Sequence, residues 1–136
     1  MYKIIIFTHG TFSKGLLETS SLILGEQPKI EFFSVELGCD LSNLKDQVSK
    51  SLESAKKDQE EVLVLTDLMY GTPFNIMVEL QKNYKFHHIT GVNLPMLLEA
   101  INCRDTGTLA EVAGEIVDVA QNGIVDVQRL LEEMEE

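Results

Sequence analysis

A histidine and an aspartate that each follow an apolar run are the residues of this chain best suited to chemistry. His9 follows KIIIFT, and Asp67 follows EVLVLT. A carboxylate bonded to one imidazole nitrogen fixes the tautomer and the orientation of the ring, and it leaves the other nitrogen with a free lone pair. That nitrogen then serves as a nucleophile, a base or a metal ligand. A lone histidine at the end of a strand is more often structural, so a chemical role for His9 depends on Asp67.

The residues that follow the pair predict phosphate binding. Gly10 comes directly after the histidine, and Gly71 and Thr72 lie just past the aspartate. Thr72 is followed by a proline, which predicts an N-cap and the first position of a helix. Helix starts present unpaired N–H groups and a partial positive charge. A histidine between two such starts is well placed to carry a phosphoryl group.

Other ligand chemistries fit the sequence less well. The segment GTFSKG at 10–15 lacks the Gly-Lys-Ser/Thr ending of a phosphate loop, and G-x-G-x-x-G is absent, so no nucleotide cofactor is expected. His87 and His88 are adjacent and point to opposite faces of a strand, so no metal site is predicted. Cys39 and Cys103 fit no metal spacing and are expected to be reduced thiols.

Composition and charge narrow the class of protein. The chain has 136 residues, which favours one domain, and a net charge of -11, which argues against nucleic acid as a partner. No apolar run approaches the roughly 20 residues that cross a bilayer. The N-terminal run has no cleavage pattern after it, so we expect no signal peptide and a cytoplasmic protein.

Strand and helix patterns alternate along the chain. Short apolar runs predict strands at 3–8, 30–35, 61–66 and 87–92. Helical spacing or start signals predict helices at 12–24, 40–57, 73–83, 95–103 and about 108–121. The alternation predicts a single α/β domain with a mainly parallel central sheet, helices on both faces and a flavodoxin-like strand order. If the first and third strands are neighbours, His9 and Asp67 face the same crevice at the carboxyl edge.

Large apolar side chains near the pair favour a docking surface for a protein partner. Leu68, Met69 and Tyr70 form a loop cluster, for which packing against the core is the alternative. Phe12 and Pro95 open the predicted helices at 12–24 and 95–103, and we place both in the same surface. Exposed aromatic and apolar groups of this kind often mark protein interfaces.

Three segments resemble the signature segments of the enzyme IIA domain of the mannose family of bacterial sugar phosphotransferase systems. They contain THG after the first strand, TDLMYGTPFN and GVNLPMLLEA, in the family's order and separation. The last is the most specific of the three. The resemblance covers essentially the whole chain, so it identifies residues 1–136 as one IIA domain.

The resemblance implies a phosphotransferase that works as a carrier. His9 matches the histidine that accepts a phosphoryl group from the carrier protein HPr and donates it to a IIB protein, which phosphorylates sugar during import. Asp67 matches the aspartate that bonds the imidazole, so that Nε2 is the nucleophile. Thr72 replaces a family serine and keeps the hydroxyl that, with amides such as that of Gly71, supports the phosphoryl group; we include Gly10 in this phosphoryl-binding set.

The loop after Asp67 departs from the pattern. Leu68, Met69 and Tyr70 stand where the best-known member has a tryptophan-containing loop, which bears on partner preference rather than on the chemistry. A related branch serves dihydroxyacetone kinases and has a Gly-Ser-containing loop there, so this sequence does not favour that branch.

The family fold implied by the resemblance adds a fifth, antiparallel edge strand from the C-terminal region, exchanged between two subunits. GIVDVQRL at 123–130 fits that role and predicts a homodimer, although its pattern also suits a continuation of helix. Because the chain stops at Glu136, we expect a free-standing IIA whose IIB, IIC and IID partners are separate chains, the membrane subunits being reached only indirectly.

Two functions from other classes stay open. One is a flavodoxin-like protein that binds a small phosphorylated ligand or a flavin in the same crevice. The other is a regulatory module that accepts phosphate on His9 and passes none on. The sugar is not specified, because specificity lies with the membrane subunits.

Overall fold

Four parallel β-strands form the centre of the protein, in a computed structural model that describes residues 1–135. The strands are β1 (Lys3–His9), β2 (Ile30–Val35), β3 (Val62–Thr66) and β4 (His87–Thr90). Their order is β2-β1-β3-β4, and each neighbouring pair is parallel. The predicted strand positions and the flavodoxin-like order are confirmed. β1 and β3 are buried along nearly their whole length, as apolar strands are when helices cover both faces.

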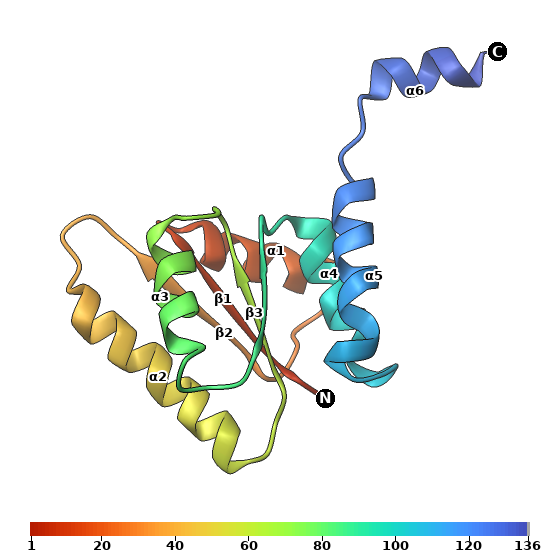
Figure 1. The fold of residues 1–136 in the computed structure, drawn as a ribbon. Helices are drawn as coiled ribbons and strands as arrows, with labels where there is room; N and C mark the ends of the chain where they lie inside the picture. Colours follow the sequence, from red (N-terminus) through yellow and green to blue (C-terminus); the bar gives the residue numbers. More distant parts are fainter. Residues whose placement is uncertain (136) are drawn as a thin grey trace.

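Helices cover both faces of this sheet, so the fold is a single α/β domain (Figure 1). The α-helices are α1 (Phe12–Leu24), α2 (Leu41–Lys57), α3 (Thr72–Leu80), α4 (Leu94–Asn102), α5 (Leu109–Asn122) and α6 (Val127–Met134). A short 3-10 helix, η1 (Cys103–Asp105), continues from α4.

The alternation of side chains along β1 divides the core into two layers. Ile4 and Ile6 belong to an apolar cluster with residues of α1, α4 and α5, among them Leu97. Ile5 and Phe7 belong to a second cluster with residues of α2 and α3. Successive strand residues point to opposite faces, so one strand supplies both layers.

The register of the central strands sets what meets at the carboxyl edge of the sheet. Phe7 of β1 pairs with Thr66, the last residue of β3. β1 continues to His9, which pairs with Val35 of β2. Asp67 directly follows β3, so the aspartate and the histidine leave the sheet at the same edge, as predicted.

Side-chain caps begin α2 and α4, whereas α3 begins differently from the prediction. Asp40 caps α2 and Asn93 caps α4, each accepting from a backbone N–H three residues on. Thr72 was predicted as the N-cap of α3, and this is wrong. The N-cap is Gly71, and Thr72 is the first helical residue, with no side-chain hydrogen bond closing the turn.

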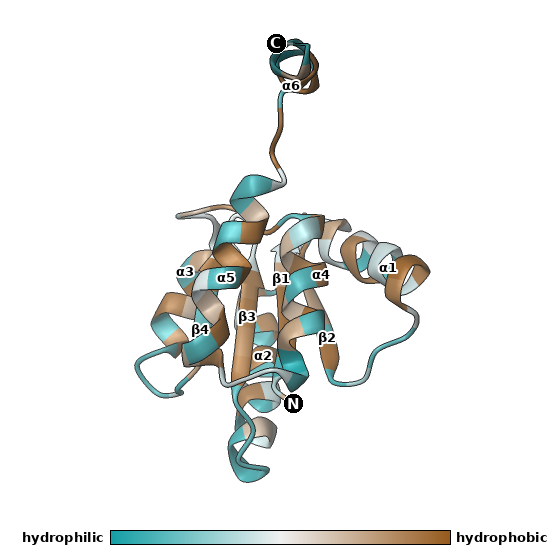
Figure 2. Cartoon of the chain, turned by 90° about the vertical axis from the view of Figure 1, so that its right-hand side faces the viewer, coloured by the Kyte–Doolittle hydropathy of each residue, from teal (hydrophilic) through white to brown (hydrophobic). Residues whose placement is uncertain are grey.

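The C-terminal region differs from the fold that the resemblance implied. Within residues 1–135 the sheet has four strands, all parallel, and 123–130 adds no antiparallel strand to it. Residues 124–126 belong to neither a helix nor a strand, and α6 follows this segment. Figures 1 and 2 show α6 standing apart from the rest of the molecule. No residue of α6 is buried.

No helix within residues 1–135 is both long and apolar enough to cross a membrane.

Candidate active site

His9 and Asp67 are in direct contact at the carboxyl edge of the sheet. Nδ1 of His9 lies 2.9 Å from Oδ2 of Asp67. The same carboxylate oxygen accepts the backbone N–H of His9 at 3.0 Å. The imidazole is 45% exposed and the carboxylate 15% exposed, so the pair presents the ring to solvent and keeps the acid largely covered.

This contact determines what the histidine does chemically. A carboxylate oxygen only accepts hydrogen bonds, so the proton of the neutral ring belongs on Nδ1. Nε2 then holds the free lone pair. The backbone hydrogen bond fixes the carboxylate, and the carboxylate fixes the ring. The arrangement therefore offers an oriented, solvent-accessible nitrogen nucleophile at the edge of the sheet.

The start of α3 provides free hydrogen-bond donors beside the pair. The N–H of Gly71 donates to the carbonyl of Leu68 at 3.0 Å, so it is already used. Within residues 1–135 no hydrogen bond uses the N–H of Thr72 or of Phe74, and Pro73 has none to offer. The first turn of a helix leaves such groups without an intrahelical partner. The free donors at this turn are therefore the N–H groups of Thr72 and Phe74, and not that of Gly71.

A threonine hydroxyl accepts a backbone N–H at the start of α1, and the sequence pattern did not predict this contact. Oγ1 of Thr8, fully buried in β1, accepts the N–H of Ser13 at 2.7 Å. Gly10 adopts a left-handed conformation with φ of 55°, and its N–H donates to Val35 at 2.8 Å. Glycine is the residue best suited to that conformation. Gly10 thus turns the chain after His9, but its amide is committed to β2.

The predicted docking residues divide into two groups. Phe12 is exposed at the start of α1, and Leu68, Met69 and Tyr70 are exposed on the turn after β3, so these side chains do not pack into the core. We call these four residues the apolar rim. Pro95 is half-buried and lies close to the backbone of α5's C-terminal end, and it is not among the exposed apolar side chains.

Tyr70 has an uncommon backbone conformation within the apolar rim. Its φ is 66°, in the left-handed region that a bulky residue rarely adopts. Its carbonyl accepts the side-chain amide of Asn75 at 3.1 Å, and its ring lies edge-on to Phe74 with centroids 5.5 Å apart. These contacts hold the tyrosine at the tip of the turn.

A second histidine, His88 near the start of β4, lies in a different environment. Nε2 of His88 lies 2.8 Å from Oγ1 of Thr66, which donates to Thr90 at 2.8 Å. The ring also packs beside Phe74 and Phe86. Burial, and secondarily the neighbouring His87, lowers the pKa of His88 to about 4.

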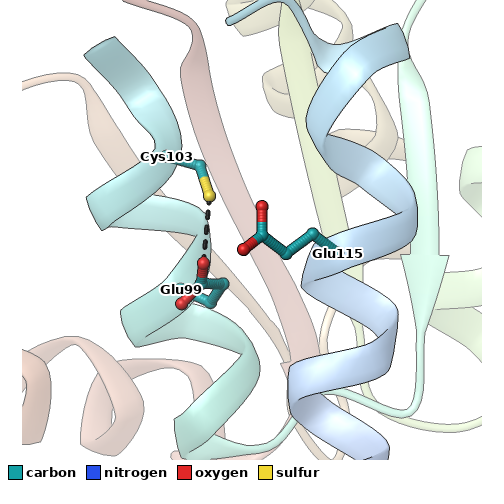
Figure 3. Close-up of side chains that lie close together, drawn as sticks. All are labelled: Glu99, Cys103 and Glu115. Carbon is teal, nitrogen blue, oxygen red and sulfur yellow. Dashed lines mark hydrogen bonds between the residues drawn. The ribbon is translucent and has the colours of Figure 1, made fainter. Parts of the chain in front are cut away.

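A further group of polar side chains comes from α4, η1 and α5 (Figure 3). Sγ of Cys103 donates to Oε1 of Glu99 at 3.2 Å, and the nearest ligand atoms of Glu99, Cys103 and Glu115 lie within 4.8 Å of one another. Burial and the nearby carboxylates raise the pKa of the Cys103 thiol to about 11. The thiol therefore stays protonated as a donor. Cys39 and Cys103 are both unpaired, as expected.

Comparisons with known proteins agree on one family. The family model described as "PTS system fructose IIA component" matches residues 3–117. The chain is 29% identical over 122 residues to the PTS system fructose-specific EIIA component of Bacillus subtilis, covering 89% of this chain and 83% of that protein.

A longer relative and a solved structure extend the similarity. The chain is 32% identical over 124 residues to the PTS system mannose-specific EIIAB component of Escherichia coli, and the match spans 89% of this chain and only 38% of that one. The crystal structure of phosphotransferase system component EIIA from Streptococcus agalactiae superposes with a TM-score of 0.87 at 32% identity. That match covers 95% of this chain and 99% of the other.

Proposed function

Because the chain belongs to the EIIA family of the mannose, fructose and sorbose phosphotransferase systems, and is a phosphocarrier component of sugar uptake, we propose that Nε2 of His9 carries the phosphoryl group. The observation that supports this assignment is the 2.9 Å contact between Nδ1 of an exposed His9 and Asp67. It leaves one nitrogen free on a ring that is 45% exposed.

The transfer step follows from that geometry. The Nε2 lone pair of His9 attacks the phosphorus of phospho-HPr, and the bond between that phosphorus and the HPr imidazole nitrogen breaks. HPr keeps the electron pair of the broken bond. Donation to a IIB protein repeats the step with His9 as the leaving group. Both partners reach the same nitrogen, so they bind in turn through a phospho-enzyme intermediate.

Asp67 acts on this step through the ring. Phosphorylation on Nε2 with Nδ1 still protonated leaves a cationic imidazolium, and the carboxylate 2.9 Å away stabilises that charge. When His9 donates the group, the same contact keeps the ring in one tautomer and one orientation.

The start of α3 supports the phosphoryl oxygens in this proposal. The Thr72 hydroxyl and the free N–H groups of Thr72 and Phe74 are the donors, and the helix dipole adds a partial positive charge. The amides of Gly71 and Gly10 are omitted from this role because both donate to backbone carbonyls.

The apolar rim is the docking surface for HPr and for the IIB partner. These four residues expose large side chains on the segments that directly follow the strands of His9 and Asp67. A common surface explains how one histidine serves two protein substrates. This exchange takes place in the cytoplasm, where the family's carrier proteins meet.

The C-terminal arm, residues 124–134, assembles two copies of the chain in this proposal. Its apolar side chains are exposed, and they are Ile124, Val125, Val127, Leu130, Leu131 and Met134. Both β2 and β4 are edge strands with unpaired backbone groups on their outer side. An exchanged arm would add an antiparallel strand to one edge of the partner's sheet and bury these side chains.

Sedimentation tests the assembly directly. The full chain is expected to sediment as a dimer, and a variant that ends at Gly123 is expected to be a folded monomer. A full-length monomer at high protein concentration would rule out the exchange, and it would leave the proposal for His9 untouched.

Intact-protein mass spectrometry tests the carrier function. After incubation with phosphoenolpyruvate, enzyme I and HPr, the chain should gain one phosphoryl group that is lost in acid, and His9→Ala should gain none. The phosphorylated chain should then lose the group to a IIB protein. No gain with a demonstrably active HPr would favour a ligand-binding protein, and a gain without onward transfer would favour a regulatory module.

A further inference from the structure

The missing side chain of Gly71 has a definite use at the active site. We propose that Gly71 is a positioning residue: its bare Cα provides the space in which the His9 ring rests, and this space fixes the rotation of the ring. The consequence for transfer rests on the proposed function, whereas the effect on the ring does not.

The space at Gly71 is occupied by the histidine itself. A Cβ added to Gly71 would lie 2.8 Å from Cε1 of His9, closer than real Cβ contacts come. The next neighbours are the carbonyl oxygen of Leu68 at 3.1 Å and its Cβ at 3.5 Å. The ring is therefore packed directly against this glycine, and any side chain there must displace it.

Backbone conformation does not explain a glycine at this position. Gly71 has φ of -74° and ψ of 170°, which any residue adopts. Gly10, Gly25, Gly38 and Gly91 differ, since their φ values are positive and they have no atom within 4 Å of an added Cβ. Gly71 is thus required for space, whereas these four are favoured for their conformation.

The two contacts of the His9 ring act on different atoms. Asp67 holds Nδ1 by a hydrogen bond, and Gly71 lies against Cε1, the carbon between the two nitrogens. A hydrogen bond to one nitrogen alone leaves the ring free to swing about it. The packing at Cε1 limits that swing, and it places Nε2, one bond further, beside the start of α3. Gly71 thereby brings the nucleophile to the donors of Thr72 and Phe74.

A methyl group at this position is the sharpest test. In Gly71→Ala the imidazole must move by several tenths of an ångström, which lengthens or breaks its contact with Asp67. Long-range 1H–15N correlation spectra at mildly alkaline pH report the two ring nitrogens of His9. The wild type is expected to show one protonated nitrogen, Nδ1, and one unprotonated, Nε2. Gly71→Ala is expected to show averaged signals from mixed tautomers.

A matched control separates this effect from that of a glycine-to-alanine change. Gly15 lies inside α1, the helix that follows His9, and an added Cβ there meets nothing within 4 Å. Gly15→Ala should leave the His9 signals and phosphoryl transfer unchanged and raise stability slightly, since alanine favours helix. In Gly71→Ala the turnover rate should fall by about 100-fold with little change in KM, as expected for a misplaced reacting group.

A double-mutant cycle keeps the proposal testable if Gly71→Ala is poorly folded. If the clash is with the ring, Gly71→Ala should cost thermal stability in the wild type and much less in a His9→Ala background, where the ring is gone. Equal losses in both backgrounds would assign the clash to the Leu68 carbonyl and overturn the proposal. Unchanged His9 signals in a folded Gly71→Ala protein would overturn it as well.

The outcomes also distinguish this proposal from the proposed function. If the wild type is never phosphorylated, but the spectra and the cycle behave as expected, Gly71 positions a histidine with some other task. If phosphorylation occurs on His9 and Gly71→Ala transfers at the wild-type rate with an unchanged ring, the carrier function stands and the positioning role falls.

Discussion

His9 and His88 lie on the two strands that flank β3, and their partners make them chemically different. His9 is 45% exposed and contacts a carboxylate. His88 is half-buried, contacts the hydroxyl of Thr66 and packs beside two phenylalanine rings. Oγ1 of Thr66 donates to Thr90, so it accepts a hydrogen bond from the Nε2–H of His88. The nitrogen that is free in one histidine is engaged in the other.

The difference shows why we propose His9, and not His88, as the phosphoryl acceptor. An imidazole is available for chemistry when an anion holds one nitrogen and solvent reaches the other. Burial opposes the cation that a phosphorylated ring becomes, and it lowers the pKa of His88 to about 4. The Asp67 carboxylate and the exposure of the ring are therefore what separate the two cases.

The largest expected effect comes from replacing the two histidines in turn. His9→Gln should lose all phosphorylation by phospho-HPr, because glutamine has no nucleophilic lone pair of this kind. His88→Gln should still gain one phosphoryl group on His9, since in the wild type the His88 ring is already engaged by Thr66. Mass spectrometry of both variants, with circular dichroism as a check of folding, measures this. Phosphorylation that disappears only in His88→Gln would reverse the comparison.

Changing the partner of each histidine should have a smaller effect. Asp67→Asn keeps the shape of the side chain but removes the charge and accepts either tautomer, so transfer should slow on the order of 100-fold. Thr66→Val should leave transfer near the wild-type rate and lower the melting temperature, because it removes the hydrogen-bond partner of the half-buried His88 ring. Quench-flow measurement of phosphoryl transfer gives both rates. Equal slowing by the two variants would mean that Asp67 has no special role.

The apolar rim predicts an effect on binding rather than on chemistry. Tyr70→Gly removes an exposed ring and also relieves a left-handed conformation that costs about 1 kcal/mol or more for a non-glycine residue. We therefore expect KM for phospho-HPr to rise by about fivefold to thirtyfold, as for the loss of an interface anchor. The free energy of unfolding should stay the same or increase. A stability loss with an unchanged KM would indicate that Tyr70 is structural.

The smallest effect is a pH dependence of stability that belongs to His88. Its pKa is about 4 in the folded protein and 6.5 when unperturbed, so the unfolded chain binds a proton more readily. Stability should therefore fall as pH drops from about 6.5 towards 4. In His88→Gln, denaturant unfolding across this window should depend less on pH. Identical pH profiles for the two proteins would show that His88 titrates normally in the fold.

Much of the fold was predictable because the strands are near-continuous apolar runs. The runs of β1 and β3 show little alternation, which predicted a parallel sheet covered on both faces. The strand order was expected by analogy with flavodoxin-like sheets. The contact between His9 and Asp67 followed in turn, since neighbouring parallel strands deliver their next residues to one edge.

The parts that were missed depend on contacts that sequence spacing does not encode. Thr72 was predicted as the N-cap of α3 because it precedes a proline. In the structure the last extended residue is Gly71, so Gly71 is the N-cap and Thr72 already belongs to the helix. The amides of Gly10 and Gly71 are used by the carbonyls of Val35 and Leu68, which only the folded chain brings within reach. The hydrophobic pattern of 123–130 suited either a strand or a helix. In the structure, residues 124–126 belong to neither, and α6 begins at Val127.

The register of β1 against β3 couples correct folding to activity. Shifting this pairing by a single residue would turn Ile4 and Ile6 towards α2 and α3, and it would also separate His9 from Asp67. With the proposed roles of His9 and Asp67, a misassembled sheet is expected to be inactive in phosphoryl transfer as well as unstable. Specific activity per molecule consequently serves as a reporter of sheet fidelity, and refolded or heat-stressed samples could be graded by it without any structural probe.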